Sequence, residues 1–376
     1  MTSHAQHLSQ ILACEADRIQ SFGSEYAFYA DQLRELADRL DSGRFHLAVL
    51  GQFKRGKSTL INALLGEALL PSSVIPLTAI PTLITYGNRR SIRIRFWGDR
   101  PDEVVKDGTS SDLYRALLHS VSEEFNPKNE QGVLQVEVTH PAPILAEGVV
   151  LIDTPGIGSV HQHNTEMTLN FLARCDAALF LVSADPPITE VEVEFLRVIR
   201  DAVTKVFFVL NKVDYLTDDE QKVALTFFET VLHEQAGIQG PVTIFLVSAK
   251  RGLAAATTND AVLWQSSGVA QVSDHLVGFL ASEKNTVLRD AITKKARAVL
   301  GAVALRLELS RRALEMPLDD LKDRMRMFEA KIREAELQRR HAADVLEGDH
   351  KRVAAWLEEE MRVLREQSIA HLMGVA

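Results

Sequence analysis

The first 41 residues carry apolar side chains at alternating steps of about three and four positions, which is the spacing of one helix face. These side chains are Leu8, Leu12, Ile19, Phe22, Tyr26, Tyr29, Leu33, Leu36 and Leu40. The pattern predicts one helix that runs to about Asp41 and ends at Ser42-Gly43. Because an apolar stripe must be covered in a folded chain, this helix requires a partner helix.

The middle of the chain alternates short apolar runs with stretches of helical periodicity, which indicates an α/β domain. Strands are expected at Phe45–Leu50, Thr82–Tyr86, Ile92–Phe96, Leu134–Val138, Val149–Ile152, Ala177–Val182, Val206–Leu210 and Val242–Val247. Helices are expected at Ser58–Leu65, Asp112–Glu124, Glu166–Arg174, Glu190–Asp201 and Asp218–Gln235. Several strands are continuously apolar, as strands covered on both faces are. We therefore expect a doubly wound sheet that binds its ligand at the carboxyl ends of the strands.

From about Ser282 onward the strand signals vanish and helical periodicity resumes. One helix is marked by Leu288, Ile292, Val299, Val303 and Leu307, and after a break at Pro317 a heptad-like run begins at Leu321, Met325, Phe328, Ile332 and Ala335. We expect these helices to bundle with the N-terminal helix as a stalk. This divides the chain into residues 1–42, 43–282 and 283–376. The pattern stops at the C-terminus without a cap, as it would in a truncated chain.

The composition excludes several classes of protein. A net charge of −9 over 376 residues argues against nucleic acid as a partner. The two cysteines, Cys14 and Cys175, form neither a disulfide framework nor a metal set, which fits a reducing cytoplasm. The sequence has no secretory signal and no apolar run of membrane-spanning length. We therefore expect a cytoplasmic protein that can lie on a membrane surface without crossing it.

Four short motifs each follow directly on an expected strand, so they should converge on one edge of the sheet. They begin at Gly51, Asp153, Asn211 and Ser248. The first has the form G-x-x-x-x-G-K-[ST], in which backbone N–H groups approach phosphates, the lysine reaches the terminal ones and the serine binds magnesium. With the threonine that follows, this phosphate loop comprises Gly51, Gln52, Phe53, Lys54, Arg55, Gly56, Lys57, Ser58 and Thr59.

The third and fourth motifs indicate a guanine base. The Asp214 carboxylate can accept hydrogen bonds from the N1–H and the exocyclic amine of guanine, whereas adenine presents an acceptor in one of these places. Asn211 is expected to tie this loop to the phosphate loop, and Lys212 to lay its alkyl stem across the purine. In Ser248-Ala249-Lys250, the backbone N–H of Ala249 would bind the base oxygen. The ligands are therefore GTP and GDP.

Magnesium and the γ-phosphate require further groups. Ser58 would bind the ion directly and Asp153 through a water, while Gly156 would offer its N–H to the γ-phosphate. Between the first two motifs, Thr78 is the expected switch threonine that closes onto the ion and the phosphate; Thr82 competes with it but more readily starts the next strand.

Two departures from signalling GTPases concern catalysis. Ile157 stands where those enzymes place a glutamine that orients the attacking water. Lys54 and Arg55 place charge in the phosphate loop, where one of them could stabilise the transition state; either could instead face solvent or pair with a carboxylate. Lys54 is the stronger candidate, so the expected catalytic set is Lys54, Lys57, Thr78 and Gly156. His161 and His163 are interpreted as surface residues of a loop after the second motif.

Together these features resemble the dynamin superfamily, and most closely the bacterial dynamin-like proteins. The resemblance rests on Gly51–Thr59, Pro76–Pro81, the Asp153–Gly156 motif with its hydrophobic follower, Asn211–Asp214 and the helices on both sides. It implies a GTPase whose nucleotide domains dimerise and whose stalk carries the motion to a membrane. Dynamin itself has glutamine and serine at the positions of Phe53 and Lys54, so its cation-assisted mechanism does not transfer. Guanylate-binding relatives have an arginine finger at the position of Lys54.

Three functional hypotheses remain at this stage. The first is a mechanochemical GTPase that self-associates and remodels an anionic membrane, although no lipid-binding tip is evident in the chain. The second is a ribosome- or RNA-associated assembly GTPase, against which the acidic net charge and the balanced helical tail argue. The third is a switch that recruits a partner protein through its helical stalk. A partner helix supplied by another protein would cover the same apolar seams as an internal bundle.

Overall fold

The computed structural model describes residues 2–71, 80–98, 100–106, 110–122, 125–156, 171–172, 174–315 and 318–374. The chain divides by packing into two compact units, Met1–Val303 and Ala304–Ala376. This division describes only how the residues pack against one another. The domain boundaries expected after residues 42 and 282 therefore stay a prediction. None of the described helices is both long and apolar enough to cross a membrane.

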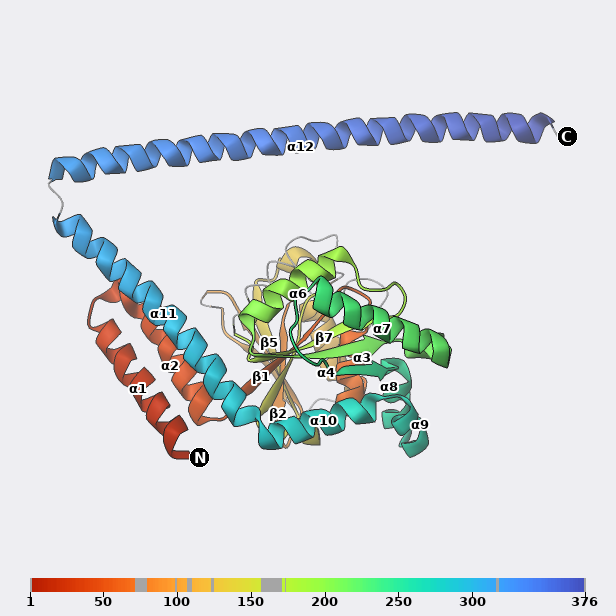
Figure 1. Ribbon diagram of the computed structural model, residues 1–376, viewed down its shortest axis with the longest axis horizontal. Helices are drawn as coiled ribbons and strands as arrows, with labels where there is room; N and C mark the ends of the chain where they lie inside the picture. Colours follow the sequence, from red (N-terminus) through yellow and green to blue (C-terminus); the bar gives the residue numbers. More distant parts are fainter. Residues whose placement is uncertain are drawn as a thin grey trace. The chain divides into compact units, whose positions relative to one another are not determined.

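The first unit is built on a nine-stranded sheet with the order β4-β3-β5-β2-β6-β1-β7-β8-β9 (Figure 1). The strands are β1 (Phe45–Leu50), β2 (Thr82–Tyr86), β3 (Ser91–Phe96), β4 (Glu103–Lys106), β5 (Val133–His140), β6 (Val149–Asp153), β7 (Ala177–Ser183), β8 (Lys205–Asn211) and β9 (Ile244–Val247). Every strand expected from the sequence is present. The sequence did not reveal β4, an exposed edge strand without the apolar alternation that marks a half-buried one.

The strands β6, β1, β7, β8 and β9 are parallel, so their carboxyl ends lie at one edge. On the other side β2 runs antiparallel to β6 but parallel to β5, and β3 runs antiparallel to both β5 and β4. The result is a mixed sheet. The expected fold class, a doubly wound nucleotide-binding domain with flanking helices, is confirmed.

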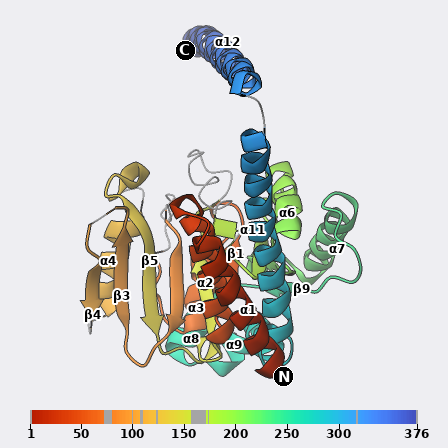
Figure 2. The same cartoon turned by 90° about the vertical axis from the view of Figure 1, so that its left-hand side faces the viewer.

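Helices cover both faces of the parallel half of the sheet (Figures 1 and 2). One face packs against α6 (Glu190–Ala202) and α7 (Asp218–Glu234), whose apolar side chains join those of the strands in a single core. The other face packs against α10 (Val269–Ser282), where the Phe279 ring lies 5.6 Å from that of Phe45 and 5.1 Å from that of Phe207. The remaining helices of this domain are α3 (Lys57–Leu65), α4 (Ser110–Val121), α8 (Ala249–Thr258) and α9 (Ala261–Ser266). The helix expected at Glu166–Arg174 lies largely outside the described residues.

The N-terminal segment is two helices rather than the single one predicted. The chain forms α1 (Thr2–Gln20) and α2 (Ala27–Asp41), joined through Gly23 and the 3₁₀ turn Ser24–Tyr26. At Gly23 the backbone φ is 135°, a value that glycine adopts readily and other residues rarely do. The chain therefore turns back on itself, and the apolar stripe of one helix covers that of the other. An ion pair of 3.0 Å between Arg34 and Asp17 joins them at the surface.

The first part of α11 (Lys284–Glu315) and the helix α2 are both fastened to the amino-terminal end of the sheet. Asp176, which directly precedes β7 and is fully buried, accepts hydrogen bonds from Arg39 Nη2 of α2 at 2.6 Å and from Lys295 Nζ of α11 at 2.9 Å. The backbone N–H of His46 in β1 donates to the same carboxylate at 2.9 Å. Burial alone would raise the pKa of Asp176, but the adjacent Lys295 and Arg39 outweigh burial and hold that pKa below its usual value.

The second unit contains the end of α11 and the helix α12 (Leu318–Gly374). α11 ends and α12 begins on either side of the break expected at Pro317, a residue outside the described ranges. α12 is continuous and extends well beyond the heptad-like run that the sequence indicated up to Ala335. Most of its apolar side chains that the structure describes are exposed, including Phe328 at 66% and Trp356 at 61%.

Candidate nucleotide-binding site

The phosphate loop connects β1 to α3 at the carboxyl edge of the sheet. Its backbone takes positive φ values of 148° at Gly51, 65° at Lys54 and 94° at Gly56. A Cβ at Gly51 would lie 2.4 Å from the carbonyl oxygen of Leu181, so glycine is required there for space as well as for conformation. The loop leads directly into the N-terminus of α3, where free N–H groups and the helix dipole favour an anion.

Lys57 is one of two buried cations of this loop, the other being Arg55. Lys57 begins α3, its side chain is buried, and its Nζ donates to the carbonyl oxygens of Gly51 at 3.1 Å and Gln52 at 3.3 Å. Burial lowers the pKa of Lys57 to about 8, against the opposing effect of the Asp153 carboxylate. A buried ammonium group with a depressed pKa gains favourable interactions when an anion binds beside it. The residues therefore fit a phosphate chain.

Two oxygen-bearing side chains meet next to Lys57. The hydroxyl of Ser58 donates to Asp153 Oδ2 at 2.8 Å, which joins the first and second motifs. A hydroxyl and a carboxylate are hard oxygen donors of the kind that Mg²⁺ prefers, so Ser58 and Asp153 fit the ion that a nucleoside triphosphate brings with it. Gly156 packs on the phosphate loop, where a Cβ would lie 3.0 Å from both the backbone N and Cα of Phe53.

Asn211 ties the third motif to the phosphate loop, as the sequence predicted, and also binds the Ala249 N–H, which the sequence had assigned to the base oxygen. Its Nδ2 donates to the carbonyl oxygen of Arg55 at 2.7 Å, and its Oδ1 accepts from the backbone N–H of Ala249 at 3.0 Å. Ser248 and Ala249 are buried, Lys212 and Asp214 are partly buried, and Lys250 is exposed. A cavity of about 530 Å³ at this end of the site is lined by Asp214, Ser248 and Arg251 among others.

The chain matches the family model described as "Dynamin family" over residues 47–213, a range that contains the first three motifs. It also matches "Elongation factor Tu GTP binding domain" over residues 136–296. An uncharacterized protein of Caldicellulosiruptor sp. is 35% identical over 316 residues, which are 83% of this chain and 76% of that protein. The "Bacterial dynamin-like protein" of Nostoc punctiforme is 29% identical over 311 residues, 76% of this chain. The chain belongs to the dynamin superfamily.

Other relatives align over smaller parts of this dynamin-superfamily GTPase. "Dynamin-like protein A" of Bacillus subtilis is 29% identical over 177 residues, 47% of this chain. The chain spans 44% of the Nostoc protein and 14% of the Bacillus protein. A solved structure described as "An oligomerised bacterial dynamin pair provides a mechanism for the long range sensing and tethering of membranes" shares the fold. It has a TM-score of 0.52 and 18% identity, and the likeness covers 92% of this chain and 53% of that one.

In this GTPase the adjacent cations Lys54 and Arg55 of the phosphate loop have different surroundings. The guanidinium of Arg55 is buried and bound to Glu192, with Nε–Oε1 at 2.8 Å and Nη2–Oε2 at 2.5 Å. It also donates to Ser183 Oγ at 2.6 Å and to the carbonyl oxygens of Pro186 and Pro187. Of the roles considered for Arg55, the structure shows pairing with a carboxylate. Lys54 is exposed, and its Nζ lies 5.4 Å from the centre of the Phe53 ring.

The partners of Arg55 were not anticipated from the sequence. Glu192 lies 137 positions from Arg55, so no local pattern pairs them. A local signal for Glu192 does exist, because Thr189 and Glu192 form a capping box at the start of α6, with the Thr189 N–H donating to Glu192 Oε2 at 3.0 Å. The Glu192 carboxylate therefore caps α6 and also holds Arg55 of the phosphate loop.

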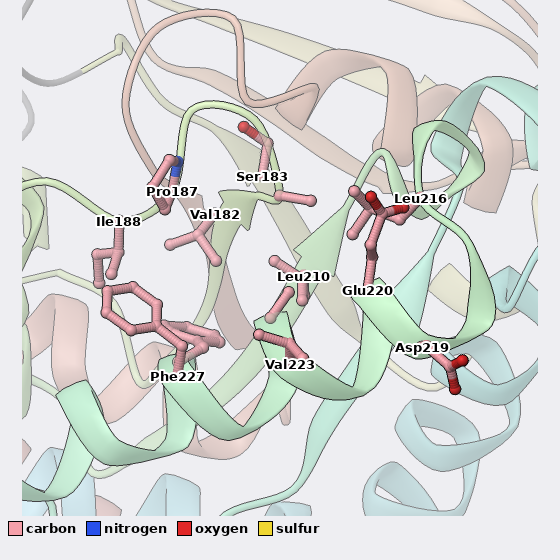
Figure 3. Close-up of a pocket in the computed structure, with 13 residues that line it drawn as sticks. Val182, Ser183, Pro187, Ile188, Leu210, Leu216, Asp219, Glu220, Val223 and Phe227 are labelled. Atoms are coloured by element: carbon pink, nitrogen blue, oxygen red, sulfur yellow. The ribbon is translucent and has the colours of Figure 1, made fainter.

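A second cavity, of about 510 Å³, lies between α7 and the loop that precedes α6 (Figure 3). Its walls are mainly apolar side chains of the strand ends, the loop and α7, including Val182, Ile188, Leu210 and Phe227. Ser183 and Pro187, which bind Arg55, also line it. The loop that fixes Arg55 is thus one wall of the cavity.

Four residues singled out from the sequence, Thr78, Ile157, His161 and His163, lie outside the described residues. Thr82, the alternative switch threonine, is buried and begins β2 opposite Asp153 of β6 in the sheet register, as expected for a strand residue. Gln52, Phe53 and Thr59 lie partly buried in or next to the phosphate loop.

Proposed function

We propose that this guanine-nucleotide-binding GTPase is a mechanoenzyme, in which nucleotide-dependent pairing of two nucleotide domains is coupled through the flanking helices to membrane remodelling. The observation that carries the proposal is the attachment of α2 and α11 to Asp176. This carboxylate lies at the amino-terminal end of β7, and the phosphate loop lies at the carboxyl end of the adjacent strand β1. Motion at the nucleotide edge would reach the helices through these rigid strands.

Each residue of the candidate site has a proposed role in binding GTP or Mg²⁺. The backbone of residues 51–59 and the Lys57 ammonium would hold the phosphates, and Ser58 and Asp153 would hold Mg²⁺, with Asp153 acting through a water. Gly156 and Thr78 would bind at the γ-phosphate. Asp214 and Lys212 would select guanine, and Ala249, whose N–H donates to Asn211 Oδ1, would complete the base loop together with Lys250. Magnesium, when bound, neutralises charge on the β- and γ-phosphate oxygens.

The partners proposed are a second copy of this chain, an anionic membrane surface reached through parts not evident in it, and a protein partner at the helices. Self-association is supported by the solved relative of similar fold, which is described as an oligomerised bacterial dynamin pair. Nucleic acid is not proposed, since the net charge of −9 disfavours a polyanion. The placement in the cell proposed here is cytoplasmic, with peripheral attachment to the membrane.

GTP turnover per molecule should rise steeply with protein concentration and then saturate, because each nucleotide domain would complete the site of the other. Phosphate release measured from well below to well above the midpoint of association would show this rise. The variant Lys57→Ala, followed over the same range, gives the background. A turnover per molecule that is low and constant at all concentrations would contradict pairing and favour a solitary switch that acts through a partner protein.

Lys54→Ala should leave GTP affinity within about threefold of wild type and reduce kcat at least about tenfold. The side chain is exposed at the phosphate loop and free of the ion pair that engages Arg55, so it can reach a developing charge on the phosphate. Single-turnover hydrolysis measures the change, and Lys54→Arg, which keeps the charge, should recover most of the rate. If kcat is unchanged in Lys54→Ala, this lysine has no catalytic role.

A further inference from the structure

α12 carries an apolar seam with nothing packed on it among the described residues. Its members recur at steps of about three and four, which places them along one face of the helix. They are Met325, Phe328, Ile332, Ala335, Ala342, Leu346, Val353 and Trp356. The six large side chains among them are between 43% and 70% exposed. A seven-residue apolar repeat of this length is the pattern of a helix that supercoils with another.

Two charged residues interrupt the seam, and their positions favour one orientation of a second copy of α12. In the seven-residue repeat, Arg339 occupies the position between Ala335 and Ala342, and Asp349 the position between Leu346 and Val353. A parallel copy of α12 in register would place Arg339 against Arg339 and Asp349 against Asp349, and such like-charge contacts are strongly unfavourable. An antiparallel copy can place each arginine against an aspartate.

We propose that α12 is a homodimerisation helix, which pairs with α12 of a second copy of this chain in antiparallel orientation, with Arg339 of each copy opposite Asp349 of the other. This register has its centre at residue 344. It places Ala342 against Leu346 and Ala335 against Val353, so that small side chains meet larger ones. It also places Ile332 against Trp356. Once Arg339 is placed opposite Asp349, these other pairs align without any further shift of one helix along the other.

The flanks of the seam agree with the same register. Lys331 of one copy lies next to Glu359 of the other on the edge of the interface, and this contact occurs twice because the dimer is two-fold symmetric. Within its own helix, Asp349 forms an ion pair with Arg352 and Glu359 forms one with Arg362 at 2.6 Å. These are exposed contacts between neighbouring turns and leave each carboxylate with further acceptor positions. Glu360 would face Phe328, which limits the favourable overlap to residues 331–359.

This interface differs from the one in the proposed function, since it lies in the helical unit and requires no nucleotide. It can therefore be tested in the full chain without GTP, where association through the nucleotide domains makes no contribution. Failure of one proposal then leaves the other intact. Circular dichroism and GTP turnover at saturating protein concentration establish that each variant is folded.

Distances between spin labels on the nucleotide-free chain test the orientation. Cys14 is replaced by serine because it is exposed, whereas Cys175 is buried and does not react. With Ala343→Cys the labels should lie within about 20 Å of each other, since packed helix axes are about 8–10 Å apart. With Met325→Cys they should be separated by about 57 Å along the axis, or 38 residues at 1.5 Å each. Short distances at both sites, or no dipolar coupling at either, would overturn the proposal.

Charge exchange tests the register. Arg339→Asp and Asp349→Arg should each weaken nucleotide-free dimerisation at least tenfold in sedimentation equilibrium, because each creates two like-charge contacts. The double variant R339D/D349R should return to within about threefold of wild type. Glu358→Arg, an exposed change on the face of α12 opposite the seam, is the control for a general charge effect. A chain that is monomeric at all concentrations, or single variants that dimerise as wild type does, would show that the proposal is wrong.

Discussion

Lys57→Ala is expected to weaken GTP binding by at least about 100-fold, which corresponds to ~2.8 kcal/mol at 1.4 kcal/mol per tenfold change. The ammonium group of Lys57 is buried at the start of α3 and its pKa is lowered by burial to about 8. A phosphate chain would supply the counter-charge that compensates for this burial, and alanine would remove the interaction altogether. Titration with a fluorescent GTP analogue, with Mg²⁺ present, measures the dissociation constant.

Lys222→Ala is the matched control for the loss of a lysine. Lys222 lies on α7, its side chain is 76% exposed, and its ion pair with Asp219 is a surface contact between neighbouring turns. The affinity of the Lys222→Ala variant for GTP should equal that of wild type. If Lys57→Ala binds GTP within about threefold of wild type, the loop of residues 51–58 is not the phosphate site, and the assignment of the other three motifs would need to be revised.

Asp176→Ala is expected to lower the free energy of unfolding by about 3–5 kcal/mol, the usual effect of removing one partner from a buried ion pair. The variant leaves Arg39 and Lys295 without their shared carboxylate, and the His46 N–H without its acceptor. Chemical denaturation followed by circular dichroism measures the loss. Asp176→Asn should also be strongly destabilised, since the amide keeps the shape but not the charge.

The surface pair between Arg34 and Asp17 is the control for Asp176, because it also joins two helices but lies in solvent. Asp17→Ala should leave the denaturation midpoint almost unchanged. If Asp176→Ala were no less stable than Asp17→Ala, the buried cluster would not fasten the helices to the sheet. The proposed path of motion from the nucleotide edge to α2 and α11 would then lose its support.

The location of the candidate site could be read from the sequence because each motif is local and stands at the end of an apolar strand. Gly51–Ser58 follows β1, and Asp153 ends β6. Once these strands are parallel, their carboxyl ends meet, and the contact of 2.8 Å between Ser58 and Asp153 follows from the topology. The role of Arg55 could not be decided in this way, because its partner Glu192 comes from another helix far along the chain.

The N-terminal helices show where periodicity alone was misleading. The apolar spacing continues through Phe22 and Tyr26 as if one helix ran to Asp41, yet Gly23 allows the chain to turn. Periodicity reports which side chains must be buried, but not whether the covering surface belongs to another segment or to the same one folded back. The hairpin of α1 and α2 covers most of the same side chains with about half the length in each helix, although Phe22 is 47% exposed.

The sequence by itself located the phosphate loop, indicated a guanine nucleotide and predicted the order of most of the strands and helices. These depend on residue types at short spacings, which the backbone geometry of a loop, strand or helix fixes locally. Only the tertiary structure decided that Arg55 is neutralised by Glu192, that Asp176 joins α2, β1 and α11, and that β2 runs antiparallel to β6. These contacts join residues distant in sequence, and which distant groups meet depends on how the whole chain packs.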